Sequence, residues 1–160
     1  MKKKWIISLL IALLAMIVFL LWNSQQNRPA PAFSLPEIHS QTMISEKNFI
    51  GKTTLLNFWY PSCPGCVEEM PKLMALQKKH PHLQIIGISL NVNTEEEVKH
   101  FIQQHGISFQ VAYDKNSEAK NAYEIQFTPS TYLIDRQGNM LRYYIGEPDW
   151  QEVEQYLNKQ

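Results

Sequence analysis

The chain contains only two cysteines, Cys63 and Cys66, separated by Pro64 and Gly65. They follow an almost continuously apolar run, residues 54–60, which indicates a buried strand that leads into a helix. A cysteine at the start of a helix lies beside unpaired backbone N–H groups, which stabilise its thiolate and make it nucleophilic at neutral pH. This order of residues predicts thiol-disulfide chemistry.

The spacing also assigns a role to each sulfur. Cys63 falls at the helix start and is predicted to attack, whereas Cys66 points inward and is predicted to resolve the mixed disulfide. A static disulfide is the first alternative, but so short a loop removes little chain entropy. Half of a zinc site is the second, but no other cysteine exists and His80 and His82 form an isolated pair. We therefore predict no metal and no cofactor besides a redox-active Cys63–Cys66 disulfide.

The surrounding pattern alternates strands and helices. Strands are expected at 33–35 and 42–44, which would form a peripheral hairpin, at 53–60, 83–90 and 109–112, and in a closing hairpin at 131–135 and 140–145. Helices are expected at 64–80, 94–105, 116–124 and 149–158, the second of them opened by a Thr94-x-x-Glu97 capping box. These elements predict an α/β sandwich with a mixed sheet.

The N-terminal segment predicts a membrane anchor. Residues 5–22 are apolar and uncharged, lie between Trp5 and Trp22, and follow three lysines. About 18 helical residues reach about 27 Å, close to the thickness of the hydrocarbon layer. We divide the chain into a signal anchor or transmembrane helix at 1–22, a linker at 23–31 and one globular domain at 32–160.

The same segment predicts a location. By the positive-inside rule the lysines stay in the cytoplasm, so the domain would lie on the periplasmic or extracytoplasmic side of a bacterial membrane. A cleaved signal peptide is the alternative, but the small-x-small sequence Ala30-Pro31-Ala32 lies about ten residues beyond Trp22.

Charge excludes one class of partner. The 160 residues include 15 Lys plus Arg and 15 Asp plus Glu, so no net positive field favours nucleic acid.

Several motifs together resemble one family. Phe-Trp-Tyr-Pro-Ser-Cys-Pro-Gly-Cys at 58–66, followed by Glu69-Met70-Pro71, resembles the thioredoxin superfamily and specifically its membrane-anchored TlpA/ResA-like thiol-disulfide oxidoreductases. Pro-Ala-Phe-Ser-Leu-Pro at 31–36, Gly51-Lys52 and Phe-Thr-Pro-Ser-Thr at 127–131 extend the resemblance over residues 31–159. It implies a thioredoxin-like three-layer sandwich whose substrates are protein thiols and disulfides.

The resemblance also implies roles for residues around the cysteines. Pro129 would be cis and lie against the disulfide, with the backbone of Thr128 offered to a bound substrate. Glu69, one turn after Cys66, would be a partly buried catalytic carboxyl that exchanges protons with the thiols; the alternative is a surface glutamate like Glu68. The expected substrate-binding residues are Trp59, Pro64, Gly65, Thr128 and Pro129, and Trp59 is also expected to belong to the core and the wall of the active site.

Two departures leave the direction of electron flow open. Ser62 stands where the family usually has Trp, and Pro64-Gly65 differs from the Gly-Pro, Glu-Pro or Pro-Pro pairs common in relatives. A reductant is expected, for example of apocytochrome cysteines in cytochrome c maturation, with a transmembrane thiol carrier as electron donor. A disulfide-forming oxidant is the alternative.

Three weaker alternatives concern other activities. A peroxiredoxin-type peroxidase needs Pro-x-x-x-Thr/Ser-x-x-Cys, and Leu56 and Tyr60 occupy those places before Cys63. A copper chaperone would have Cys-x-x-x-Cys and a later ligand histidine where this chain has Thr128. In a simple binding module the intact cysteine pair would serve no purpose.

Overall fold

The computed structural model describes residues 11–18 and 28–159. Residues 11–18 are helical with exposed side chains. The rest of the expected anchor and most of the expected linker lie outside the described residues. Across the two described ranges, no helix has the length and apolar character needed to cross a membrane.

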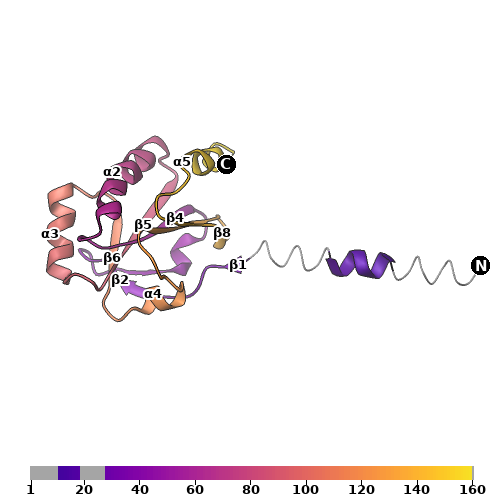
Figure 1. Ribbon diagram of the computed structural model, residues 1–160, viewed down its shortest axis with the longest axis horizontal. Coiled ribbons are helices and arrows are strands. Elements are labelled where there is room, and N and C mark those ends of the chain that lie inside the picture. The colour runs from indigo at the N-terminus through magenta and orange to yellow at the C-terminus, as the bar shows by residue number, and fades with distance from the viewer. Residues whose placement is uncertain (1–10, 19–27, 160) are drawn as a thin grey trace, which may run out of the picture.

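The centre of the fold is a six-stranded mixed sheet (Figure 1). Its strand order is β1 (Arg28–Pro29), β8 (Asn139–Ile145), β7 (Ser130–Ile134), β4 (Thr53–Trp59), β5 (Leu83–Leu90) and β6 (Gln110–Asp114). Strands β4, β5 and β6 are parallel, whereas β7 and β8 are antiparallel to their neighbours. The carboxyl ends of the three parallel strands therefore meet at one edge of the sheet.

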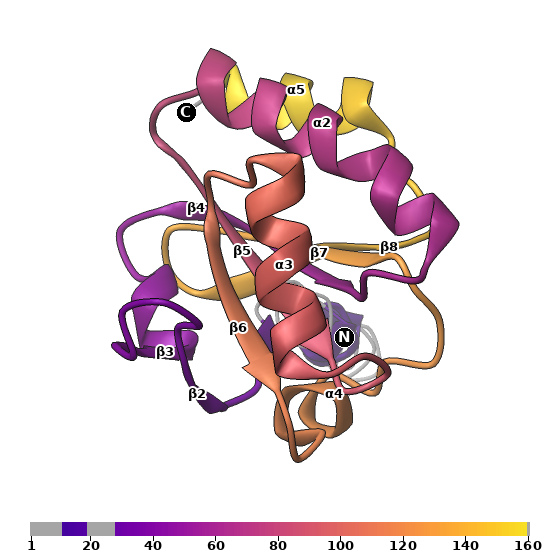
Figure 2. The same cartoon turned by 90° about the vertical axis from the view of Figure 1, so that its left-hand side faces the viewer.

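Both faces of the sheet are covered. Helices α2 (Pro64–Lys79), α3 (Glu95–His105) and α5 (Trp150–Leu157) pack on one face. The hairpin β2 (Ser34–Pro36) and β3 (Met43–Ser45), the short helix η1 (Glu46–Phe49) and α4 (Glu118–Ala122) pack on the other. Figure 2 shows α2 and α5 above the sheet and α4 with the hairpin below it. The expected α/β sandwich with a mixed sheet is confirmed.

The central strand β4 is apolar almost throughout because both of its faces are buried. All seven residues of β4 are buried, with Leu55 in the core beneath α2 and Leu56 in the core beneath α4. A strand buried on both faces needs apolar side chains on both. Consequently β4 is held rigidly, and it delivers Cys63 to the sheet edge.

The capping box is also confirmed. The Thr94 backbone N–H donates to Glu97 Oε2 at 2.7 Å, and the Glu97 backbone N–H donates to Thr94 Oγ1 at 3.3 Å. Gly106 ends α3 in the left-handed region at φ 61°.

Two elements were not expected from the sequence, η1 and β1. Arg28 and Pro29, assigned above to the linker, pair with Met140 and Asn139 of β8. The Ala30 backbone N–H then donates to the Gly138 carbonyl at 2.9 Å. The sheet thus begins before residue 32, because a two-residue strand is held by backbone pairing and leaves no hydrophobic period in the sequence.

Candidate active site

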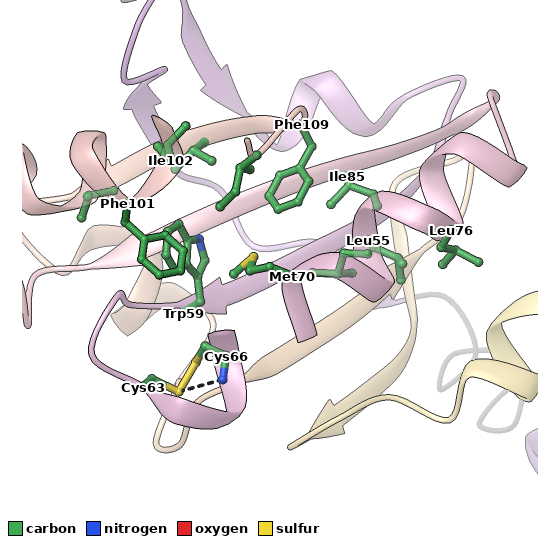
Figure 3. Close-up of a cluster of buried hydrophobic side chains, with 14 of the residues drawn as sticks. Leu55, Trp59, Cys63, Cys66, Met70, Leu76, Ile85, Phe101, Ile102 and Phe109 are labelled. Atoms are coloured by element: carbon green, nitrogen blue, oxygen red, sulfur yellow. Dashed lines mark hydrogen bonds between the residues drawn. A yellow bond between two sulfur atoms is a disulfide. The ribbon is translucent and has the colours of Figure 1, made fainter. Parts of the chain in front are cut away.

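The two cysteines lie at the start of α2, immediately after the carboxyl end of β4. Cys63 is the N-cap residue, and its Sγ accepts a hydrogen bond of 3.2 Å from the Cys66 backbone N–H (Figure 3). Pro64 occupies the first helical turn, where a missing N–H costs nothing. Cys63 and Cys66 form a disulfide with Cα atoms 5.2 Å apart, within the range that such bonds allow.

The exposure of the two sulfur residues differs in the direction that the expected roles require. Cys63 is 5% exposed and Cys66 is fully buried. A partner can therefore reach Cys63 first, whereas Cys66 is buried in the position expected of the resolving group. The assignment of Cys63 as the attacking thiol stays a prediction, now with a geometric basis.

Pro129 lies beside the loop between the two cysteines. The Thr128–Pro129 peptide bond is cis, as the resemblance implies. A Cβ added at Gly65 would lie 3.4 Å from Pro129 Cδ, so the proline lies against the loop between the cysteines. Pro64 and Gly65 are exposed. The Thr128 backbone N–H and carbonyl have no hydrogen-bond partner within residues 28–159, which leaves both free for a substrate chain.

Trp59 does not fit the substrate-contacting role expected for it. Its side chain is fully buried and its ring packs against Phe101 with centroids 5.2 Å apart (Figure 3). The indole points into the core beneath α2 and α3, because this position of β4 faces those helices. The expected place of Trp59 in the core and the wall behind the cysteines is thus confirmed, whereas a direct contact with substrate is excluded by its burial.

Glu69 is buried, with an exposed fraction of 1%. Its Oε2 accepts a hydrogen bond of 3.3 Å from Asn57 Nδ2, and its Oε1 accepts one of 3.5 Å from Thr131 Oγ1. Burial raises the pKa of Glu69 to about 7, against the opposing effect of the Asn57 hydrogen bond. A carboxyl with such a pKa can hold or release a proton near neutral pH. The neighbouring Glu68 is exposed, so the surface-glutamate alternative applies to Glu68 and not to Glu69.

Three polar residues of this region were missed in the sequence. Asn57 and Thr131 contact Glu69, and Asn93 accepts hydrogen bonds from the Ser62 hydroxyl at 2.9 Å and the Ser62 N–H at 3.3 Å. The available signal for Asn57 was its amide inside an apolar strand. No comparable signal marks Thr131 or Asn93, because their contacts join distant segments.

A metal centre finds no support in the described part of the chain. No group of three or more His, Cys, Asp or Glu side chains in residues 11–18 and 28–159 is arranged to hold a metal ion.

Comparison with known proteins places this geometry in a family. A sequence profile described as the AhpC/TSA family matches residues 27–143. The chain belongs to that family. It is 33% identical over 136 residues to the thiol-disulfide oxidoreductase ResA of Bacillus thuringiensis, covering 84% of this chain and 78% of the relative. It is also 28% identical to the thioredoxin-like protein YneN of Bacillus subtilis over 99% of both chains.

Solved structures agree with the sequence relatives. The solution structure of a thioredoxin-family protein from Neisseria meningitidis superimposes with a TM-score of 0.74 at 37% identity, covering 83% of this chain and 89% of the other. The protein is thus a thioredoxin-like dithiol-disulfide oxidoreductase, and Cys63–Cys66 is its cysteine couple. Proteins of this kind use the disulfide itself as the redox group.

Proposed function

We propose that this oxidoreductase is anchored in a bacterial cytoplasmic membrane and reduces disulfides of partner proteins on the extracytoplasmic side. The anchor is residues 1–22, whose apolar run at 5–22 follows three lysines. A cysteine pair in that compartment can cycle through a disulfide out of direct reach of cytosolic reductants.

The buried Glu69 is the observation that favours a reductant. It lies one turn after Cys66 on the buried side of α2, and a carboxylate there disfavours a nearby thiolate. Strong disulfide-forming oxidants owe their potential to a stabilised reduced form with a low-pKa thiolate. Glu69 acts in the opposite sense, so it makes the reduced pair a better electron donor.

The substrates are proposed to be extended segments of proteins that contain a disulfide. The unpaired backbone groups of Thr128 and the exposed Pro64-Gly65 loop would receive such a segment beside Cys63. The ResA-like resemblance favours apocytochrome c cysteines as the target, with a transmembrane thiol carrier as the electron donor.

An oxidant is the second candidate, because one observation favours it. Cys63 is the N-cap of α2 and accepts a hydrogen bond from the Cys66 N–H, both of which stabilise a thiolate. We do not propose a peroxidase, because Leu56 and Tyr60 occupy the two positions where the peroxidase motif needs a proline and the small hydroxyl side chain of Thr or Ser.

The equilibrium potential of the Cys63–Cys66 couple tests the proposal. A reductant should have a potential near that of thioredoxin, about −270 mV, and a value near about −120 mV would reverse the order of the two candidates. The reduced protein should also reduce a disulfide-linked Cys-x-x-Cys-His peptide of the haem-attachment kind in a single turnover. The matched control is the same peptide oxidised to a dimer through one cysteine, with the other replaced by serine. If the reduced protein reduced neither the Cys-x-x-Cys-His peptide nor the dimeric control, the proposed reductase activity would be contradicted.

A further inference from the structure

A cavity of about 850 Å³ lies at the end of the sheet remote from the cysteines. Its wall includes Thr53 and Leu83, the first residues of β4 and β5, and the carboxyl end of α2 at Lys79. Because strand residues rise about 3.3 Å each, Thr53 lies about 20 Å from Trp59 at the other end of β4. The cavity is therefore separate from the thiol site.

The ionisable side chains lining this cavity are all basic or histidine, and no Asp or Glu is among them. They are Lys52, Lys79, His80, His82 and Arg136. Lys79 is neutralised by Glu154 at 2.7 Å. Lys52 and Arg136 form no ion pair with any carboxylate of the described ranges, so the cavity has a local positive excess in a chain of zero net charge.

The arginine is held in place by backbone contacts. Arg136 Nε donates to the Gly51 carbonyl at 3.3 Å, and the Gly51 N–H donates to the Arg136 carbonyl at 2.8 Å. The terminal guanidinium nitrogens have no partner within residues 28–159, and neither has the buried Nε2 of His80. A guanidinium oriented by one hydrogen bond, with its terminal nitrogens unpaired, matches the oxygens of a phosphate group.

The tether enters the domain at this same end. Arg136 lies in the turn between β7 and β8, and the next residues of that turn hold the start of the domain through the Ala30–Gly138 hydrogen bond and the pairing of Pro29 with Asn139. Only five residues separate Trp22, the end of the apolar stretch, from Arg28. Six peptide units reach at most about 20 Å, so an anchored chain keeps this end close to the lipid headgroups.

We propose that this cavity binds the phosphate group of anionic lipid headgroups, an inference that rests on the membrane placement proposed above. Lys52 and Arg136 supply the positive charge and the N–H donors. Binding there orients the domain with the basic end toward the bilayer and Cys63 toward soluble partners.

The test uses the full chain in nanodiscs of phosphatidylcholine alone or with added phosphatidylglycerol. Acylation of Lys52 by an amine reagent, followed by mass spectrometry, should slow at least about threefold with phosphatidylglycerol, while acylation of Lys120 stays unchanged. The thermal midpoint should rise by about 3 °C in the same discs. Equal acylation rates of Lys52 and equal thermal midpoints in the two kinds of nanodisc would overturn the proposal.

Matched variants separate the cavity from general charge attraction. The Lys52→Gln and Lys52→Gln/Arg136→Gln variants should lose the rise in midpoint, and Lys115→Gln/Lys120→Gln, which removes the same charge at the other end of the sheet, should keep it. Lys52→Gln alone leaves the Arg136–Gly51 contacts intact, so it controls for misfolding. A rise retained by both cavity variants would contradict the proposal.

Inorganic phosphate tests whether the cavity binds a free anion in place of a lipid headgroup. Protection of Lys52 by phosphate in phosphatidylcholine discs, with none by phosphatidylglycerol, would exclude the lipid headgroup as the source. Peptide reduction measured on the same discs reports the proposed reductase activity independently, and failure of the chain to incorporate into discs would contradict the anchor itself.

Discussion

The side-chain amide of Asn57 donates a hydrogen bond of 3.3 Å to Glu69 Oε2, joining the central strand β4 to helix α2, whose N-cap is Cys63. The same Nδ2 donates to Thr131 Oγ1 at 2.9 Å. All three side chains are buried, and Asn57 Oδ1 has no partner within residues 28–159. The amide is therefore the main group that favours the charged form of Glu69 against its burial.

Removal of this amide should raise the pKa of Glu69. In Asn57→Ala the carboxylate loses its strongest hydrogen-bond donor, so its pKa should move above the value of about 7 that it has with Asn57 in place. A carbon-13 NMR titration of the Glu69 carboxyl would measure the change. Thr54→Val, which removes a different polar group from β4, should leave the titration unaltered; an unchanged or lowered pKa in Asn57→Ala would contradict the assignment.

Glu69→Gln should stabilise the oxidised protein at alkaline pH. The folded pKa of about 7 lies above the ordinary value of 4.5, so the stability contributed by the protonated carboxyl is complete below pH 4.5 and is lost as pH rises through 7. Keeping the charge buried at pH 8 costs on the order of 3 kcal/mol. Urea unfolding across this pH range should therefore show a gain of about 2–3 kcal/mol for Glu69→Gln at pH 8 and a flatter pH profile.

The adjacent glutamate provides the control. Glu68 is exposed, so Glu68→Gln should keep the pH profile of the wild type. Identical profiles for all three proteins would remove Glu69 from both the stability and the proton-transfer accounts.

The two cysteine variants should behave differently toward a disulfide substrate. In Cys66→Ser the Cys63 thiolate can still attack, so one substrate thiolate leaves and a mixed disulfide with Cys63 persists. In Cys63→Ser the remaining thiol is buried, so turnover and trapping should both be lost. Mass spectrometry under non-reducing conditions would identify the trapped cysteine, and an adduct through Cys66 alone would reverse the roles.

Gly87→Ala should destabilise the wall behind the site. A Cβ at Gly87 would lie 2.8 Å from Trp59 Nε1 and 3.0 Å from Phe109 Cε2, and both rings are buried. Such overpacking costs about 1–3 kcal/mol of unfolding free energy. Gly65→Ala meets only Pro129 Cδ at 3.4 Å, so it should leave stability nearly unchanged. Equal urea midpoints for the two variants would contradict this account of Gly87.

The order of elements and the position of Cys63 could be predicted because short stretches of sequence, namely apolar runs and helix-capping residues, determine them. The orientation of Trp59 could not. In β4 both faces are covered, so apolar residues occupy every position and the period that would show which way Trp59 points is lost. The contact of Asn57 with Thr131 depends on the register of β4 against β7, where the two residues are directly paired across 74 positions of sequence.

The first strand supplies the last prediction, which compares two truncated chains. Residues 28–160, without the anchor, should be soluble and monomeric, because the long apolar stretch is absent. Residues 32–160 should have an unfolding free energy lower by about 1–2 kcal/mol, because β1, the burial of Ala30 and its hydrogen bond to Gly138 are lost.

Arg28→Ala in the longer chain separates backbone pairing from the charge at this position. It keeps the pairing of β1 with β8, so its stability should stay within about 0.5 kcal/mol of the parent chain. Urea unfolding would rank the three proteins by their free energies of unfolding.

If residues 32–160 were as stable as residues 28–160, β1 would contribute nothing to stability and the domain would begin at residue 32. If the longer chain remained soluble only in detergent, the division between anchor and domain would be wrong, since residues 28–160 would then expose apolar surface that the sheet and its helices do not cover.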